Sequence, residues 1–327
     1  MLRALAKAAA VALGLAGCTL ASPTERGTPW SAAPSMHHGR AAHAVVAAGG
    51  ALYALAGTGA RGAPVLVVER FDGLQWHDET RLPGRGVNAP AAAVLGNRIY
   101  LIGGFDTVSN VPVASVHVYD TLTHAWSRAA PLPAPRGGHA AVVMEDGIHV
   151  IGGGNDRTTL ADHDVYDPRS DTWRALPPLP RAEGSPAATV LDGRLVAVGG
   201  RSGPADFGAV DIYDPAERRW LAGPPIEPRG TAGAVVYCGA LHVFGGESQA
   251  RGQSLDDVLR LAPAGWQRMP PMPTGRNFAR AAVLGDAVYV VGGSPTPEPS
   301  HASVGSAVVE RYRTACEDMP NDRRQAP

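Results

Sequence analysis

The sequence predicts an all-β protein, a six-bladed β-propeller with four-stranded blades, and three observations carry that prediction. The 327 residues include 40 glycines and 29 prolines, too many turn formers for a helical protein. Doublets that end in glycine close an apolar run six times, and the six tryptophans of the chain recur with nearly the same spacing. Two interlocked periods of about 47 residues indicate one repeated unit rather than separate domains.

The two periods run through almost the whole chain. The doublets end in Gly57, Gly104, Gly153, Gly200, Gly246 and Gly293, with steps of 47, 49, 47, 46 and 47 residues. The tryptophans are Trp30, Trp76, Trp126, Trp173, Trp220 and Trp266, with steps of 46, 50, 47, 47 and 46 residues. Because a four-stranded sheet of about 47 residues cannot bury both faces alone, the copies must pack against one another, and six copies close into a ring.

Each unit contains four short strand-like segments separated by turn residues. In the third unit, residues 138–144 and 147–153 are the first two strands, and Glu145-Asp146 is the turn between them. The third strand ends in Val165-Tyr166, and the fourth surrounds Trp173. Glycine suits a strand end where another backbone passes closely, and the aromatic rings suit the gaps between twisted sheets.

The order of the elements predicts how the ring closes. Trp30 precedes the first doublet and no tryptophan follows Tyr312, so the chain begins with a fourth strand and ends with three strands that lack a fourth. We therefore expect the strand near 30–33 to complete the sixth blade beside 307–313, which removes an open edge. The propeller then spans 29–313, and 314–327 form a flexible tail.

The first residues predict an exported, lipid-anchored protein. A positive head is followed by the apolar stretch 8–16, which suits a signal peptide and is too short to span a bilayer. Leu15-Ala16-Gly17-Cys18 resembles the lipobox of bacterial lipoproteins, which implies cleavage after a signal peptide of residues 1–17, lipidation of Cys18 and a tether over 18–28. An ordinary secretory peptide is the alternative. We expect the cell envelope, and the outer membrane facing the periplasm if the source is Gram-negative.

Export leaves two further cysteines, Cys238 and Cys316, in an oxidising compartment, where disulfides persist. Their positions in the chain do not decide between a bond and two free thiols.

The formal charge of −1, with 29 basic against 30 acidic residues, argues against a nucleic-acid binder that works by bulk positive charge. Contact with a membrane is expected only through the lipid anchor.

Arginine recurs ahead of each predicted innermost strand. These residues are Arg40, Arg85, Arg136, Arg181, Arg229 and Arg276, with steps of 45, 51, 45, 48 and 47 residues. Innermost strands line the channel of a propeller, so six guanidinium groups would surround one mouth and could hold a carboxylate of a ligand. The alternative is that each arginine pairs with an acid or a carbonyl and serves packing. The two roles do not exclude each other.

The loops after the doublets lie on the same face and supply further candidate binding residues. They carry Asp106, Asn155, Asp156, Arg201 and Glu247, with Arg251 further along. Loops on rigid scaffolds often carry binding residues, and opposite charges around one pocket suit a polyhydroxylated acidic ligand. Solvated loop tips are the alternative for each of them.

A glycine doublet after the second strand, then Tyr-Asp, then tryptophan, resembles the Kelch repeat. The third and fourth units match best, the fourth with Gly199-Gly200, Ile212-Tyr213-Asp214-Pro215 and Trp220. The resemblance covers Trp30 to Tyr312 and implies a six-bladed propeller. Ala56 replaces the first glycine of the first unit, and Phe71 and Leu261 stand in for tyrosine in the first and fifth units.

The fifth unit resembles the matching blade of the periplasmic sialic acid mutarotases, which are Kelch proteins. It contains Arg229-Gly230-Thr231 and then Phe244-Gly245-Gly246-Glu247. The resemblance implies that Glu247 is the acid/base carboxylate and that Arg251 binds the sugar carboxylate or polarises a ring oxygen. The spacing between these two residues is shorter than in that group.

Two functions follow as hypotheses. The first is a monomeric, lipid-anchored binding protein whose channel mouth receives an acidic small molecule, glycan, peptide or protein partner; the alternative is a sialic acid mutarotase or epimerase. The chain has no P-loop, G-x-S-x-G, H-E-x-x-H or C-x-x-C motif, and we expect no cofactor. Although His37, His38 and His43 are close in sequence, adjacent histidines on a strand point to opposite faces, so we expect no metal site.

Overall fold

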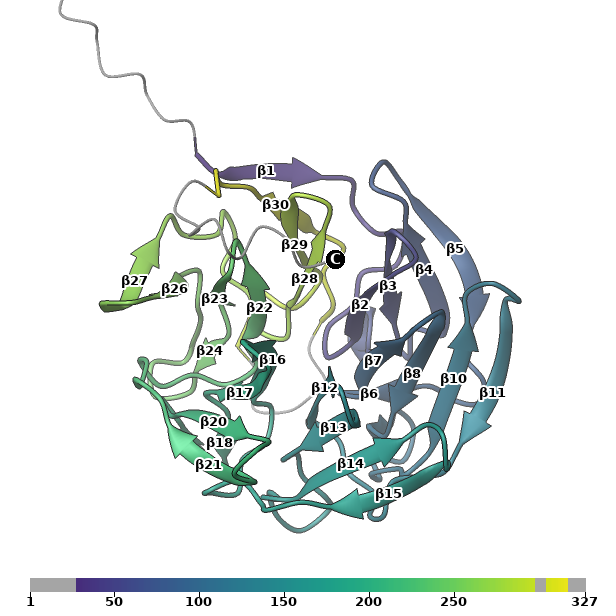
Figure 1. Cartoon of the computed structure of the whole chain (residues 1–327). Helices are drawn as coiled ribbons and strands as arrows, with labels where there is room; N and C mark the ends of the chain where they lie inside the picture. Colours follow the sequence, from purple (N-terminus) through teal and green to yellow (C-terminus); the bar gives the residue numbers. More distant parts are fainter. Residues whose placement is uncertain (1–27, 298–303, 317–327) are drawn as a thin grey trace, which may run out of the picture.

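The computed structural model describes residues 28–297 and 304–316, and these form six four-stranded antiparallel sheets arranged in a ring (Figure 1). The predicted all-β, six-bladed propeller is therefore confirmed. Cys18, with the signal peptide and most of the tether, and residues 317–327 of the tail lie outside the described residues. Within the described part of the chain, no helix has the length and apolar character needed to cross a membrane.

Blades 1 to 5 each add their strands from the channel outward in chain order. Blade 1 contains β2 (Ala44–Ala48), β3 (Ala51–Leu55), β4 (Val67–Phe71) and β5 (Trp76–Arg81), and blade 2 contains β7 (Ala91–Leu95), β8 (Arg98–Ile102), β10 (Val116–Asp120) and β11 (Ala125–Ala129). Blade 3 contains β12 (Ala140–Met144), β13 (Gly147–Ile151), β14 (His163–Asp167) and β15 (Thr172–Ala175). Blade 4 contains β16 (Ala187–Leu191), β17 (Arg194–Val198), β20 (Val210–Asp214) and β21 (Arg219–Ala222), and blade 5 contains β22 (Gly233–Tyr237), β23 (Ala240–Phe244), β26 (Val258–Ala262) and β27 (Gly265–Met269).

Blade 6 is built from both ends of the described chain. It contains β28 (Arg280–Leu284), β29 (Ala287–Val291), β30 (Val309–Tyr312) and β1 (Trp30–Ala33) as its outermost strand. β1 runs antiparallel to β30 with Trp30 opposite Tyr312, as expected from the missing fourth strand (Figure 1). This pairing covers the edge of β30 and closes the ring.

Each glycine doublet joins its blade to the next one. The backbone N–H of the second glycine donates to a carbonyl that leads into the next blade: Gly57 to Val87, Gly104 to Arg136, Gly153 to Glu183, Gly200 to Arg229, Gly246 to Arg276 and Gly293 to Arg40, at 2.9–3.1 Å. The first position of the doublet has a positive φ, which favours glycine, although Ala56 adopts it in blade 1 with φ of +62°. At Gly292, φ is +60° and a Cβ would lie 2.7 Å from the carbonyl oxygen of Arg40.

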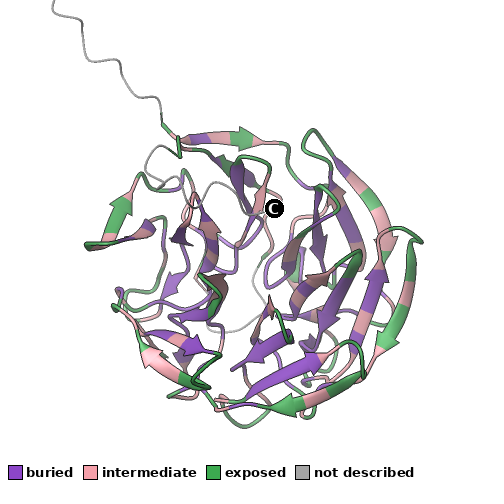
Figure 2. Cartoon of the chain, in the orientation of Figure 1, coloured by how far each residue is buried: buried purple, intermediate pink, exposed green. Residues whose placement is uncertain are grey.

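The repeated tryptophans tie each blade to the preceding one. Their indole N–H groups donate across the gap: Trp30 to Pro270, Trp76 to Pro34, Trp126 to Thr80, Trp173 to Ala130, Trp220 to Pro177 and Trp266 to Pro224, at 2.8–3.4 Å. The second strands of the blades are the most deeply buried, and the outermost strands carry the exposed residues (Figure 2). The core therefore lies between blades.

Cys238 and Cys316 form a disulfide. Cys238 lies in the turn between β22 and β23 of blade 5, and Cys316 follows β30 of blade 6. The bond therefore links blade 5 to the segment that follows blade 6. Of the two possibilities that the sequence left open, a bond or two free thiols, the structure shows the bond.

Candidate functional site

The segments leading into the innermost strands and the loops after the doublets lie on one face, as expected. Backbone bridges join the two segments within each blade, for example Ala41 to Thr58 in blade 1, Gly137 to Gly154 in blade 3 and Gly230 to Glu247 in blade 5. The segments that lead into the innermost strands and the loops after the doublets therefore form one surface, the loop face.

Four of the six repeated arginines have fully buried side chains, so they do not line an open mouth. Each forms an ion pair with a carboxylate on or next to the third strand of its own blade: Arg40 with Glu69, Arg136 with Asp164, Arg229 with Asp257 and Arg276 with Glu310. The distances are 2.6 Å for the pair in blade 5 and 2.7 Å for the pair in blade 6. The expected ring of six solvent-facing guanidinium groups is therefore wrong for these four positions.

These buried pairs hold the blades together internally. The guanidinium of Arg276 also donates to the carbonyls of Val290, Gly292 and Val308. A buried charge is tolerated when it is paired and its remaining donors are satisfied. In blade 6 the arginine therefore links the first three strands, and in all four blades it pairs with an acid of its own blade, which is the packing role that the sequence left as an alternative.

Arg85 and Arg181 do not occupy the repeated position. The interblade hydrogen bond from the second glycine reaches Val87 in blade 2 and Glu183 in blade 4, each two residues later. Positions 40, 87, 136, 183, 229 and 276 are separated by 47, 49, 47, 46 and 47 residues, the same steps as the doublets. Arg85 is exposed, and the side chain of Arg181 is 33% exposed.

Blade 4 replaces the buried arginine with a buried acid. Arg181 reaches back to Asp211 at 2.5 Å and to Glu183 at 3.5 Å, so one guanidinium serves two carboxylates. Burial, with the negative charge of Asp211, raises the pKa of Glu183 to about 8. Arg181 therefore acts within the blade rather than on a free rim.

Blade 2 lacks both members of the pair. The arginine position holds Val87, and the acid position, two residues before Tyr119, holds His117. In blade 6 the guanidinium of Arg276 contacts Val290, Gly292, Val308 and Glu310. The equivalent residues of blade 2 are Leu101, Gly103, Ser115 and His117, and all four line a cavity of about 260 Å³. Arg85 and Asp106 lie at the same cavity.

The other loop candidates mainly stabilise their own loops. Asp106 accepts hydrogen bonds from the backbone N–H groups of Val108 and Ser109, which lowers its pKa. Asn155 makes the corresponding turn in blade 3, and Asp156 beside it is exposed. These side-chain turns are a common role of Asp and Asn in loops.

Glu247 and Arg201 meet in a buried polar cluster on the loop face. Glu247, in the short strand β24 (Glu247–Ser248), is 1% exposed and forms an ion pair with Arg201, in β18 (Arg201–Ser202). Asn277 donates to Glu247 at 3.2 Å and to the carbonyl of Thr296 at 2.9 Å. The cluster joins blades 4, 5 and 6. Arg251 does not belong to it, because its exposed guanidinium pairs with Glu227.

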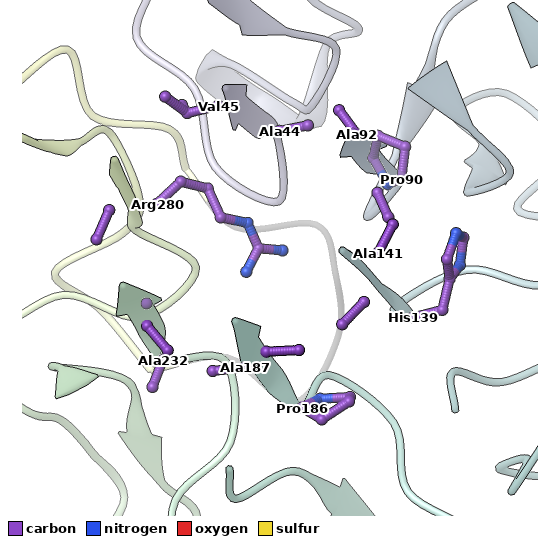
Figure 3. A pocket seen from close by; sticks show the side chains of 16 residues that line it. Ala44, Val45, Pro90, Ala92, His139, Ala141, Pro186, Ala187, Ala232 and Arg280 are labelled. Carbon is purple, nitrogen blue, oxygen red and sulfur yellow. The ribbon is translucent and has the colours of Figure 1, made fainter. Parts of the chain in front are cut away.

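The axial channel contains a charged side chain, that of Arg280, which was not among the candidates predicted from the sequence. Residues from the innermost strands of all six blades enclose a cavity of about 120 Å³. Its lining is mostly alanine, with proline, valine and glycine, and Arg280 is the only charged residue in that lining. Figure 3 shows the Arg280 guanidinium projecting into the hollow.

Arg280 has no carboxylate partner among the described residues. Its Nε donates to the carbonyl of His43 at 2.9 Å, and no ion pair involves it. Burial alone lowers its pKa to about 10, so the group remains charged at neutral pH. His139, which also lines the cavity, has its pKa lowered to about 3 by burial and by nearby arginines, so it is neutral. The channel is therefore a concave site whose one positive charge is not balanced by a carboxylate in the part of the chain that the structure describes.

A comparison of the six units could have identified Arg280. The first residues of the other innermost strands are Ala44, Ala91, Ala140, Ala187 and Gly233. One arginine among five small residues at a channel-facing position is a departure from the repeat. Such departures indicate function better than residues that recur in every blade, because recurring residues serve the architecture.

The expectation that His37 and His38 point apart is wrong. They lie in a bend between β1 and Arg40 rather than on a strand. The Nδ1 atom of His37 is 2.9 Å from one oxygen of Asp78, and the Nε2 atom of His38 is 3.5 Å from the other. His43, in contrast, is fully buried.

The fold and the site together define a class of protein: a six-bladed propeller with a small cationic pocket in its axial channel. A family model described as the KLHDC2/KLHL20/DRC7 Kelch-repeats domain matches residues 26–181 and 89–293. The chain therefore belongs to the Kelch-repeat family, as the resemblance of its repeats implies.

Individual relatives match only in part. Kelch-like protein 35 of Mus musculus is 35% identical over 127 residues, which are 38% of this chain and 21% of that protein. Kelch-like protein 6 of Homo sapiens is 41% identical over 61 residues, 19% of this chain and 10% of that protein. Among solved structures, YjhT superposes with a TM-score of 0.72 at 15% identity, over 86% of this chain and 96% of YjhT. That likeness is one of fold.

Proposed function

We propose that this protein is a lipid-anchored, extracytoplasmic binding protein whose axial channel receives the anionic group of an acidic ligand. The observation that carries the proposal is the Arg280 guanidinium, which projects into an alanine-lined cavity and has no carboxylate partner among the described residues. A charge in a partly desolvated hollow interacts more strongly with an anion than the same charge on an open surface. A planar guanidinium also matches a carboxylate in geometry.

The size of the cavity restricts the ligand. At about 120 Å³ it accepts a carboxylate and a few neighbouring atoms rather than a whole sugar or peptide. The rest of the ligand would then lie on the loop face, where Arg85 and Asp156 are exposed. An acidic glycan, or a peptide or protein that presents a carboxylate, fits this description.

Binding to acidic compounds tests the proposal. A panel containing N-acetylneuraminate, hexuronates and acidic peptides is titrated calorimetrically against the wild type and Arg280→Gln. Loss of a charge-assisted hydrogen bond is worth about 1.5–3 kcal/mol, so the variant should bind at least tenfold more weakly. Arg219→Gln, exposed on the outermost strand β21 of blade 4 and away from the channel, is the matched control. Equal affinity of Arg280→Gln and the wild type would contradict a channel site.

The anchor is proposed from Leu15-Ala16-Gly17-Cys18. If Cys18 carries lipid, Cys18→Ser should lose incorporation of labelled fatty acid and move from the membrane fraction to the soluble fraction. Retention of label in Cys18→Ser would contradict this assignment.

A second function, sialic acid mutarotation, is favoured by the buried Glu247–Arg201–Asn277 cluster, because a buried carboxylate next to donors can move a proton. Arg251 would not assist in the arrangement described, since it pairs with Glu227. Proton NMR of freshly dissolved α-N-acetylneuraminate distinguishes the two functions. A mutarotase accelerates the approach to anomeric equilibrium and loses that effect in Glu247→Gln; an uncatalysed rate with the wild type excludes it.

A further inference from the structure

A cluster of nitrogen and oxygen ligands lies outside the channel, where blade 6 passes into blade 1. One ring nitrogen of His37, one oxygen of Glu69 and one oxygen of Asp78 all lie within 4.8 Å of one another. His38 adds a second imidazole, with Nε2 at 3.5 Å from the other oxygen of Asp78. The bend at 37–38 and the hairpin of β4 and β5 therefore bring two imidazoles and two carboxylates together.

The backbone explains why the two carboxylates face each other. Glu69 in β4 is directly opposite Asp78 in β5, next to a bulge between Val68 and Glu69. Directly opposite residues share a face of the sheet, and like charges there repel. Arg40 forms an ion pair with Glu69 and is close enough to interact with the charge of Asp78, which also contacts the two imidazoles.

One ligand of the cluster is fixed and the others can adjust. Glu69 is fully buried and is held by Arg40 and by the backbone N–H of His37, which donates to it at 2.6 Å. The side chains of His37 and Asp78 are 52% and 54% exposed. Small rotations of these two side chains would bring their atoms to the separation of about 3.4 Å that tetrahedral ligands around zinc adopt, with bonds of about 2.0–2.2 Å.

We propose that His37, Asp78 and Glu69 bind a zinc ion, with His38 reaching the fourth position. Imidazole nitrogen and carboxylate oxygen are the ligand types that zinc accepts. The ion would supply the positive charge that the facing carboxylates need. Its place between β1 and blade 1 would fasten the closing strand to the next blade. The proposal is independent of ligand binding in the channel.

The strand offers a matched control. His77 precedes Asp78, so its side chain points to the opposite face, where its ring lies 2.7 Å from Asp72. This pair is also a histidine with a carboxylate near the surface, but it is not part of the three-residue cluster. Loss of His77 should therefore leave a true site intact, and should affect zinc binding only if any surface histidine suffices.

The test is a calorimetric titration of untagged protein with zinc chloride, repeated with cobalt to read the visible absorption of a four-coordinate site. We expect one equivalent to bind to the wild type and to raise its melting temperature. His37→Ala and Asp78→Asn should each weaken binding about tenfold or more and abolish the shift in melting temperature, while His77→Ala binds as the wild type. Wild-type affinity in His37→Ala, or equal loss in His77→Ala, would overturn the proposal and indicate adventitious surface binding.

Discussion

Glu183 occupies the position that carries a buried arginine in blades 1, 3, 5 and 6. It is 1% exposed, and its carboxyl group shares Arg181 with Asp211. Because Arg181 contacts Asp211 more closely, Glu183 is the member of the cluster that burial keeps protonated. This residue therefore gives the propeller a proton-binding group inside a blade.

Replacement of Glu183 by Gln should change how stability depends on pH. The folded-state pKa of about 8 lies above the ordinary carboxyl value of 4.5, so this group favours folding most below pH 4.5, and that contribution is lost as the pH rises towards 8. Because Gln does not titrate, the stability of the variant lacks this dependence on pH. Relative to the wild type it should become more stable from pH 5 to pH 9, by no more than about 5 kcal/mol.

Urea denaturation at several pH values measures this difference. Exposed Glu217 provides the control, since Glu217→Gln should shift the curve little at any pH. A constant difference between Glu183→Gln and the wild type across this range would show that Glu183 is ionised in the folded protein.

The sequence pattern predicted Arg85 and Arg181 at the repeat position that Val87 and Glu183 occupy, and the error has a physical reason. The register of a blade is set by the hydrogen bond from the second glycine, which reaches Val87 and Glu183 whatever side chain they carry. The irregular steps to Arg85 and Arg181 were the available signal. Burial of Arg40 could not be predicted in the same way, because its partner Glu69 lies 29 residues away on another strand.

Blade 2 shows what happens to the element when the ion pair is absent. Val87 and His117 replace the arginine and the acid, and the positions that would contact a guanidinium instead line the cavity of about 260 Å³. Burial and the neighbouring Arg128 lower the pKa of His117, so the imidazole is neutral and cannot substitute for a carboxylate. The arginine–carboxylate pairs of the other blades show which two residues blade 2 lacks.

Val87→Arg combined with His117→Glu should restore the pair and fill the cavity. Each single change places a charge at a half-buried position without the partner that it has in the other blades, and should destabilise the blade. The double variant should be more stable than the sum of the single effects predicts, with a coupling of about 1–3 kcal/mol in a urea-denaturation cycle. Additive effects would mean that the equivalence of blade 2 with the other blades is wrong.

The strands themselves were predictable because their requirements repeat six times. The second residue of each doublet must be glycine where the next backbone passes, and each indole donates a hydrogen bond to the preceding blade, in five cases to a carbonyl. The short pairs β18–β19 (Ala205–Asp206) and β24–β25 (Gln253–Ser254) were expected only as loops. Among the described residues, two-residue strands also form the pair of β6 (Val87–Asn88) with β9 (Phe105–Asp106) in blade 2, and strands this short leave no period in the sequence.

At the scale of the whole molecule, two ties hold blade 6 in the ring. The first is the pairing of β1 with β30, where the Trp30 ring packs 4.9 Å from the ring of Tyr312 and 6.0 Å from that of Phe244. The second is the disulfide between Cys238 and Cys316, which connects blade 5 to the segment after β30. Both ties act on the same junction between blades 5 and 6, so their contributions should depend on each other.

Trp30→Ala should lower the free energy of unfolding by about 3 kcal/mol through lost packing, and replacement of Cys238 and Cys316 by serine by about 2–4 kcal/mol. With the disulfide intact, the end of β30 stays near blade 5 even without Trp30. Combining both changes should therefore cost more than their sum in urea denaturation. Trp266→Ala, at the same repeat position in blade 5, should instead add to the cysteine changes. An unaltered stability of Trp30→Ala would place the closure of the ring elsewhere.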